Sequence, residues 1–287
     1  MKILLVILFA ILLQIGCKSE DKSQVGLKDS ESKGSLFIIG GGSRPDEMVK
    51  RMIEESGIND QGYMVILPMS SELPDSAIIW SSEQFLKQGV AHVTGFNFKK
   101  EEIPSAQWID SLANASLIYI SGGNQNRFME IVGGNEIEEA IHHAYKRGAM
   151  IAGTSAGAAV MSQVMITGNE LKSPDYRPTF RTIESDNIET ANGLGLITTA
   201  IIDQHFVWRS RYNRLFSAVI EFPQLKGIGI DESTAILVKN DQAEVVGISQ
   251  VIVFTNPENS YLEKDGKLAA RNININIYLT GEKFPIH

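Results

Sequence analysis

Five short apolar runs follow one another in the first half of the chain, and none shows the period-two alternation of a half-exposed strand. They lie at residues 36–39, 64–67, 91–96, 117–120 and 149–152. Segments with helical spacing separate them, at residues 46–56, 76–88, 106–114 and 137–147. Apolar strands that alternate with helices are typical of a parallel sheet covered on both faces. We therefore predict an α/β fold with a largely parallel central sheet flanked by helices.

The pattern changes in the second half of the chain. A helix is expected at residues 209–222, and closely spaced β runs then follow at residues 227–230, 235–238, 244–246, 251–254 and 272–278. The last run alternates Asn and Ile, as a half-exposed strand does. We expect these runs to end the sheet with antiparallel or edge strands. Because no repeat or further linker interrupts the pattern, residues 36–287 are predicted to form a single domain.

The N-terminus has the pattern of a secretory signal. An apolar run occupies residues 3–13, and Gly16 precedes Cys17. The run is shorter than the roughly 20 residues that a transmembrane helix needs. It also resembles a bacterial lipoprotein signal, in which the cysteine is lipidated, although Gln14 stands where such signals usually carry leucine. We predict a signal peptide at residues 1–16 and an exported protein, which is either membrane-anchored through a lipid on Cys17 or cleaved without a lipid into the periplasm or the extracellular space.

Residues 17–35 are rich in lysine, serine and acids. Such a segment cannot bury enough apolar surface to offset the entropy of ordering it, and we expect a flexible tether. The whole chain has 26 basic and 34 acidic residues and a net charge of −8. Removing residues 1–35 takes away five lysines and four acids, which leaves 21 basic and 30 acidic residues and a net charge of −9. The acidity therefore belongs to the predicted domain.

The composition excludes several classes of protein. With 43% hydrophobic and 21% charged residues among its 287, the chain is neither disordered nor collagen-like. Its negative charge argues against sequence-independent binding to nucleic acid, which needs a basic surface. Cys17 is the single cysteine, so there is no intrachain disulfide, no cysteine-rich zinc site and no thiol nucleophile in the domain. No spacing of His, Cys and acids resembles a metal site, and no cofactor is expected.

Glycine-rich segments follow three of the predicted strands, at residues 40–42, 122–125 and 153–157. In open parallel sheets, ligands bind at the carboxyl ends of the strands. We therefore expect the three segments to converge on one edge of the sheet. The first segment lacks the third glycine of a dinucleotide-binding loop, because Pro45 stands in that position, and this function is not favoured.

Residues 153–157 have the sequence G-x-S-x-G directly after a predicted strand and before a helical run. This context is typical of a nucleophile elbow, in which a strained turn exposes the hydroxyl of Ser155 and the flanking glycines leave room for the chain. Ser155 would lie at a helix N-terminus, where N–H groups such as that of Ala156 can stabilise an oxyanion. A phosphate loop or a simple helix cap would share the pattern, because serine is a common N-cap.

A nucleophilic serine needs a general base, and His205 is the favoured candidate among five histidines. It follows the apolar run 200–202, whereas the others lie at the C-terminus, in a predicted strand or on a predicted helix. A carboxylate must orient the imidazole. Asp231 and Glu232 both follow the predicted strand 227–230, and the physical chemistry of the sequence leaves the choice between them open. The order Ser, His, acid differs from the α/β-hydrolase order.

Four segments in this order resemble the cyanophycinases, within the S51 serine peptidases that include the aspartyl dipeptidases. The segments are residues 122–125 (GGNQ), 153–161 (GTSAGAAVM), 203–215 (DQHFVWRSRYNRL) and 227–236 (GIGIDESTAI). The resemblance runs from residue 36 to about residue 254 and implies a fold like that of the class I glutamine amidotransferases, whose cysteine nucleophile the domain lacks. It also implies a catalytic triad of Ser155, His205 and Glu232.

The resemblance implies further site residues. The oxyanion donors would be the backbone N–H groups of Ala156, Gly123 and Asn124. Arginine suits bidentate recognition of carboxylates, and the acid of the pocket could meet a substrate guanidinium. Without the resemblance, a structural ion-pair network or a solvated helix face would be the better explanation of the arginines. The implied pocket residues are Gln125, Asp203, Gln204, Arg209, Arg211 and Arg214.

The implied substrate is cyanophycin, a poly-aspartate chain with an arginine on each side-chain carboxyl. The enzyme would release β-Asp-Arg dipeptides through an acyl-enzyme on Ser155. The polar segment 172–192 has no clear counterpart in the resemblance and lies between nucleophile and base, so an aspartyl or isoaspartyl dipeptidase is an alternative. A non-catalytic surface binding protein is the alternative from another class. A homodimer is a family expectation, and an exported enzyme would meet its polymer outside the cell.

Overall fold

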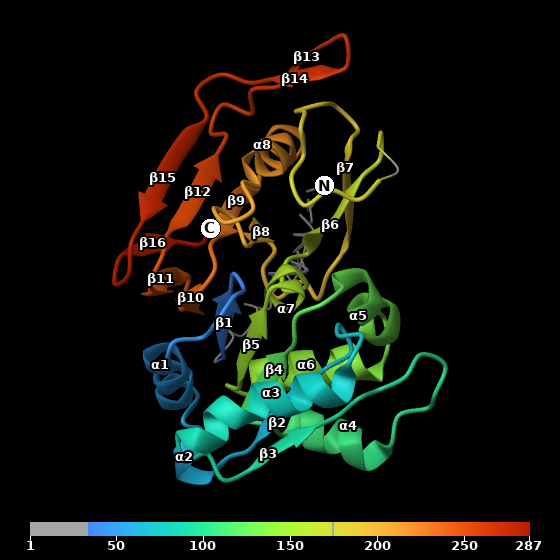
Figure 1. Ribbon diagram of the computed structural model, residues 1–287, viewed down its shortest axis with the longest axis vertical. Helices are drawn as coiled ribbons and strands as arrows, with labels where there is room; N and C mark the ends of the chain where they lie inside the picture. Colours follow the sequence, from blue (N-terminus) through green and yellow to red (C-terminus); the bar gives the residue numbers. More distant parts are fainter. Residues whose placement is uncertain (1–33, 174) are drawn as a thin grey trace, which may run out of the picture. The chain divides into compact units, whose positions relative to one another are not determined.

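Five parallel strands form one side of an eight-stranded sheet (Figure 1). The computed structural model describes residues 34–173 and 175–287. The parallel strands pair in the order β1-β5-β4-β2-β3, as the apolar runs predicted. They are β1 (Ser35–Ile39), β2 (Met64–Leu67), β3 (Val93–Gly95), β4 (Leu117–Ile120) and β5 (Met150–Thr154).

The domain begins before residue 36, where we expected its boundary. Gly34 and Ser35 are both buried, and Ser35 is the first residue of β1. The expected signal peptide, Cys17 and nearly all of the expected tether lie outside the described residues. Within residues 34–173 and 175–287, no helix has the length and apolar character to cross a membrane.

Helices cover both faces of the parallel strands. They are α1 (Asp46–Ser56), the short α2 (Ile58–Gln61), α3 (Pro74–Lys87), α4 (Ala106–Ala113) and α6 (Glu136–Lys146). Successive strand residues point to opposite faces of a sheet. Phe37 accordingly packs in one apolar cluster with Phe85 of α3, while its neighbour Ile38 packs in another with Ile141 of α6. Burial on both faces explains why these strands show no polar alternation.

Beyond β1 the eight-stranded sheet continues in antiparallel strands, as expected for its edge. They are β10 (Thr234–Lys239), β11 (Gln242–Gly247) and β16 (Lys283–Pro285), in the order β16-β11-β10-β1. Residue Phe37 of β1 lies opposite Leu237 of β10 in this register. Strand β16 was not predicted, because three residues carry too little pattern.

A second sheet of four strands contradicts the prediction that all β runs extend one sheet. Its order is β15-β12-β9-β8, with β8 and β9 parallel and the other pairs antiparallel. Helix α8 (Tyr212–Glu221) packs against it through Leu215 and Val219. An apolar run has the same appearance whichever sheet it joins, so the sequence pattern could not separate the two. The strands are β8 (Ala200–Gln204), β9 (Lys226–Ile230), β12 (Val251–Thr255) and β15 (Asn274–Tyr278).

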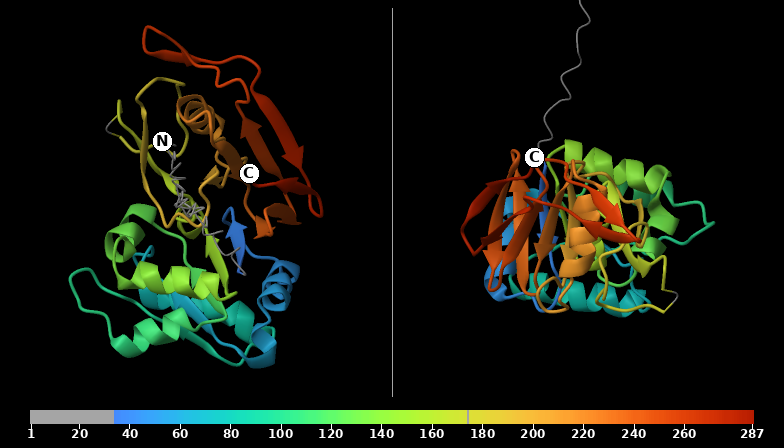
Figure 2. Two further views of the ribbon diagram at one scale, coloured as in Figure 1. Left: turned by 180° about the vertical axis from the view of Figure 1, so that it is seen from behind. Right: turned by 90° about the horizontal axis from the view of Figure 1, so that it is seen from above.

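Several elements were not predicted. Helix α5 (Gln125–Val132) follows β4, and strands β13 (Leu262–Lys264) and β14 (Lys267–Ala269) pair with each other. Helix α7 (Ala156–Ala159), a short turn of helix after β5, was in contrast expected from the helical run after the serine. Strands β6 (Val164–Glu170) and β7 (Ile188–Asn192) form an antiparallel pair that we call the β6–β7 hairpin. The hairpin lies beside β8 and α8 (Figure 2) and contains the segment 172–192.

Candidate active site

The three glycine-rich segments meet at one edge of the eight-stranded sheet, as expected. They follow β1, β4 and β5, which are adjacent in the order β1-β5-β4. A Cβ added to Gly122 would lie 3.4 Å from the Cβ of Ser155, so the second and third segments are in contact. The N–H of His205, just after β8, donates to the carbonyl of Gly40 at 2.7 Å. The end of the second sheet is thereby joined to the same edge.

Ser155 has the strained backbone of a nucleophile elbow. Its φ is 52° and its ψ is −110°, a conformation that a residue with a side chain rarely adopts and that clusters at functional sites. A Cβ on Gly153 would lie 2.3 Å from the carbonyl oxygen of Gly157, and a Cβ on Gly157 would lie 2.3 Å from that of Ile120. The two glycines therefore let β4, β5 and α7 pack closely around the turn.

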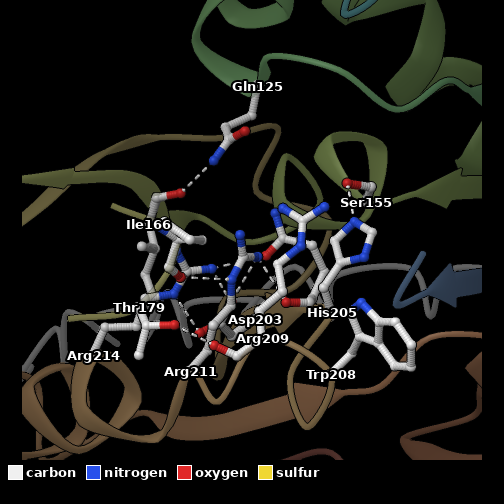
Figure 3. A network of polar contacts seen from close by, with 12 residues as sticks. Gln125, Ser155, Ile166, Thr179, Asp203, His205, Trp208, Arg209, Arg211 and Arg214 are labelled. Carbon is white, nitrogen blue, oxygen red and sulfur yellow. Dashed lines mark hydrogen bonds and ion pairs between the residues drawn. The ribbon is translucent and has the colours of Figure 1, made fainter. Parts of the chain in front are cut away.

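Ser155, His205 and Glu232 form a continuous chain of hydrogen bonds. The Ser155 Oγ lies 2.8 Å from His205 Nε2, and His205 Nδ1 lies 2.6 Å from Glu232 Oε1. Figure 3 shows the serine and the imidazole facing each other beside a cluster of arginines. With a proton on Nδ1, the imidazole donates to Glu232 and can accept the serine proton on Nε2.

Glycine at position 41 is required by the position of the imidazole. Gly41 has a φ of 121°, and a Cβ added to it would lie 2.2 Å from His205 Cε1. The carbonyl of Gly41 also accepts a hydrogen bond from the N–H of Ser233 at 2.8 Å. One glycine loop after β1 therefore holds the residue that follows Glu232 and leaves room for His205.

The surroundings of His205 favour its neutral form. Burial lowers the pKa of the imidazole below its ordinary value, because a charged ring loses hydration there. The hydrogen bond to Glu232 opposes this shift, and the positive charges of Arg209 and Arg211 add to it. A neutral imidazole is the form that can act as a general base.

The two adjacent acids have separate positions. Asp231 accepts hydrogen bonds from the Trp208 N–H at 2.8 Å and from the Ser249 hydroxyl at 2.7 Å. It has no contact with the imidazole, whereas Glu232 does. The geometry thus agrees with the acid that the resemblance implied, and it gives Asp231 a role in fixing the loop after β8.

Two of the three expected oxyanion donors are suitably placed. Among the described residues, the N–H groups of Ala156 and Gly123 have no backbone acceptor. Ala156 follows Ser155 directly, and Gly123 lies in the segment that contacts it. Asn124 does not fit the expectation, because its N–H donates to the Ser70 carbonyl at 2.8 Å. Its side chain caps α5 by accepting from the N–H of Arg127.

A pocket of about 320 Å³ opens beside Ser155. This volume is at the lower end of the roughly 300–1,000 Å³ typical of small-ligand sites. Its lining is polar and cationic rather than apolar. The expected residues that line it are Gln125, Gln204, Arg209, Arg211 and Arg214, and residues that sequence reasoning missed are Asn126, Thr167, Gly168, Asn169 and Tyr176.

Asp203 does not line the pocket, contrary to expectation. Its side chain is 0% exposed and accepts from Arg214 through both oxygens, with Nε to Oδ2 at 2.7 Å. Arg211 lies 3.8 Å from the same carboxylate. A buried charge needs such a partner, so Asp203 is already engaged by arginine and orients the pocket cations from behind.

The arginines differ in how they are held. Arg211 donates to the carbonyl of Gln204 at 2.8 Å, and burial together with the charge of Arg214 lowers its pKa to about 10. Arg209 lines the pocket as well, but within the described residues its guanidinium has no hydrogen bond or ion pair. Arg209 is therefore the cation best placed to receive an anionic group.

Gln125 connects the pocket to the hairpin. Its Nε2 donates to the carbonyls of Ile166 at 3.0 Å and Thr167 at 2.8 Å. The segment 172–192 contributes to the other wall: Tyr176 lines the pocket, and the hydroxyl of Thr179 donates to the carbonyl of Arg209 at 2.6 Å. The segment 172–192, which has no clear counterpart in the resemblance, is thus part of the site.

The described residues contain no cluster of metal ligands. Among residues 34–173 and 175–287, no group of three His, Cys, Asp or Glu side chains could hold a metal ion. The chemistry of the site can be written with its own Ser, His and Glu side chains and backbone donors.

The α/β fold and the Ser–His–Glu arrangement at the sheet edge are features of a serine-type peptidase. The model of the family described as "Peptidase family S51" matches residues 36–246. The chain belongs to this peptidase family.

Curated relatives agree with this assignment. A protein named cyanophycinase from Trichormus variabilis is 30% identical over 269 residues, which cover 89% of this chain and 87% of the relative. A cyanophycinase from Geminocystis herdmanii is 29% identical over 88% of this chain and 93% of its own. A peptidase E from Actinobacillus pleuropneumoniae is 27% identical over 51% of this chain and 60% of its own.

Solved structures are similar in fold. A crystal structure of a peptidase from an acI-B1 Actinobacterium has a TM-score of 0.65 at 21% identity and covers 89% of this chain and 98% of its own. A peptidase E protein from Listeria monocytogenes, described there as putative, has a TM-score of 0.52 at 15% identity. These similarities support the α/β fold that the apolar runs predicted.

Proposed function

We propose that this peptidase hydrolyses cyanophycin and releases β-Asp-Arg dipeptides through an acyl-enzyme on Ser155. The observation that carries the proposal is the hydrogen-bonded series Ser155–His205–Glu232 beside an arginine-lined pocket. Each unit of cyanophycin carries a free carboxylate and a free guanidinium on its arginine. A cationic pocket next to the nucleophile suits the carboxylate.

In the proposed reaction, His205 Nε2 takes the hydroxyl proton of Ser155 while Oγ attacks the scissile carbonyl. The N–H groups of Ala156 and Gly123 would stabilise the oxyanion. The imidazolium then gives its proton to the leaving amine, and the acyl-enzyme remains on Oγ. In the second half, His205 removes a proton from water, the hydroxide attacks the ester, and Oγ takes the proton back as the acid product leaves. Glu232 stabilises the imidazolium in both halves.

An aspartyl or isoaspartyl dipeptidase is the second candidate for the same site. It is favoured by the likeness to peptidase E over 51% of the chain and by the modest pocket volume of about 320 Å³. A non-catalytic surface binding protein is not favoured, since it would need neither the strained serine nor the oriented imidazole. Export, a lipid on Cys17 and a homodimer remain part of the proposal as expectations from sequence, and an exported enzyme would act on polymer outside the cell.

The substrate decides between the two peptidase activities. We expect the purified protein to release β-Asp-Arg from cyanophycin faster than it cleaves α-aspartyl dipeptides, with the products measured by liquid chromatography. Faster turnover of the dipeptides would favour the dipeptidase. A fluorophosphonate probe should label Ser155, as shown by peptide mapping, and absence of labelling in an active preparation would contradict the acyl-enzyme.

A further inference from the structure

The burial of Asp203 leaves the pocket without the acid that was expected to receive the substrate's guanidinium. We propose that Glu189 of the β6–β7 hairpin is the residue that selects for this cationic group. This inference rests on the proposed function, because it assigns the second charged group of the same substrate unit. It concerns a residue outside the segments that carry the resemblance to the cyanophycinases.

Glu189 is adjacent to two pocket residues. Its Oε2 accepts hydrogen bonds from the hydroxyl of Thr167 and from Asn169 Nδ2, the latter at 2.8 Å, and both donor residues line the pocket. The pairing of β6 with β7 is irregular between Ile166 and Glu170. Irregularities of this kind re-aim side chains and are frequent next to active sites. Here the irregular stretch carries both donors.

The charge of Glu189 is not neutralised by any described residue. Both of its side-chain contacts come from neutral donors, and no Lys, Arg or His within the described part of the chain forms an ion pair with it. Its Oε1 likewise has no hydrogen-bond partner there. By contrast, Glu232 is bonded to His205. Glu189 is therefore a half-buried, oriented carboxylate with one oxygen open to a cation.

The hairpin lies close to the arginine cluster. A Cβ on Gly168 would lie 3.8 Å from Arg214 Nη1, 3.8 Å from the ring of Tyr176 and 3.9 Å from Gln125 Nε2. The pocket thus has cations next to Gly168, and the two lining residues on either side of Gly168, Thr167 and Asn169, hold the carboxylate of Glu189. An arginine attached through its amino group carries a carboxylate at one end and a guanidinium at the other, which matches this separation of charge. The ring of Tyr176 offers a face on which a guanidinium can stack.

The test compares a short synthetic β-Asp-Arg peptide with the same peptide containing citrulline, which is neutral and nearly the same shape as arginine. We expect the wild-type enzyme to prefer the arginine peptide. Glu189→Gln keeps the acceptor for Thr167 and Asn169 but removes the charge. It should lower kcat/KM for the arginine peptide by about tenfold, mainly through KM, and leave the citrulline peptide unchanged.

Glu258→Gln is the matched control. Glu258 accepts a hydrogen bond from Asn272 Nδ2 at 2.8 Å on the exposed surface, so the chemical change is the same but lies away from the pocket. It should not alter the preference between the two peptides. If Glu189→Gln retains the wild-type preference, the role of Glu189 is wrong while the proposed function stands. If the wild-type enzyme cleaves neither peptide, the proposed function fails, and the inference fails with it.

A measurement on the wild-type enzyme does not depend on how the variant folds. Salt screens the attraction between exposed charges. The KM for the arginine peptide should therefore rise more steeply with ionic strength than the KM for the citrulline peptide, since both share the carboxylate contact but only one has the guanidinium. Equal salt dependence of the two KM values would overturn the role of Glu189.

Discussion

The two sheets contribute different parts of the candidate site. The eight-stranded sheet holds Ser155 and the backbone donors at the ends of its parallel strands. The four-stranded sheet ends in His205, and Glu232 lies on the connection from β9 of one sheet to β10 of the other. The nucleophile therefore depends on a strained turn within one sheet, whereas base and acid depend on how the second sheet is joined to it.

One apolar cluster spans the two sheets and includes Ile38 of β1 and Ile228 of β9, while backbone hydrogen bonds join the sheets next to the site. His205 donates to Gly40, and Ser233 donates to Gly41. These bonds fix the ends of β8 and β9 against the loop after β1. In this protein the parallel strands supply the exposed nucleophile, whereas the general base comes from the second sheet. The following changes test each side of this division.

Removal of the nucleophile should have the largest effect. Ser155→Ala deletes the attacking oxygen and leaves both sheets and the pocket in place. We expect kcat to fall by about 10⁴- to 10⁶-fold. Thermal stability should change little, because the substitution of alanine for serine removes no packing contact. The rate of β-Asp-Arg release and the melting temperature give the two measurements. Full activity of this variant would show that the reacting group lies elsewhere.

The acids after β9 should separate catalysis from structure. Glu232→Gln keeps the shape of the side chain but cannot stabilise the imidazolium, so kcat should fall by about 10²- to 10⁴-fold. Asp231→Asn should instead leave kcat close to the wild-type value and reduce the free energy of unfolding by about 1 kcal/mol, since it weakens the bonds to Trp208 and Ser249. Kinetics and chemical denaturation of the two variants provide the comparison. Equal losses of kcat in both would contradict the separate roles.

The smallest expected effect is a shift in the pH profile. The imidazole must be neutral to act as a base, and its pKa is lowered by burial, so activity should extend below the usual pH range of histidine. Arg209→Gln removes a positive charge that disfavours protonation of His205. The pKa should then rise, and the acid limb of kcat should move to higher pH. A movement to lower pH, measured with the same substrate, would contradict the effect of Arg209 on the pKa of His205.

The parallel part of the fold could be predicted because its signal is local. The run 36–39 is apolar at every position, since both faces of β1 are covered, and residues 153–157 carry the glycines that the turn at Ser155 requires. His205 could be found by elimination, because the other histidines lie on predicted elements or at the terminus. In each of these cases, the residues that determine the local structure are close together in the sequence.

The remaining features depend on contacts between distant segments. The division into two sheets is decided by which strands pair. The apolar run at β9 would look the same in the sequence whichever of the two sheets it joined. Asp203 lies next to Gln204 and near the arginines in sequence, but only the fold shows that Arg214 neutralises it. The backbone of Asn124 is taken by Ser70, more than fifty residues earlier. None of these partners has a signal in the sequence itself.

The β6–β7 hairpin belongs to neither of the sheets that carry the reacting groups. It reaches the pocket through side chains such as Thr167 and Tyr176, while the serine turn and the glycine loop are held by other strands. Residues 164–192 can therefore diverge in a lineage without displacing the atoms that break the bond. The preference for one peptide over another can therefore change in evolution while the catalytic chemistry is retained, because the two depend on separate parts of the chain.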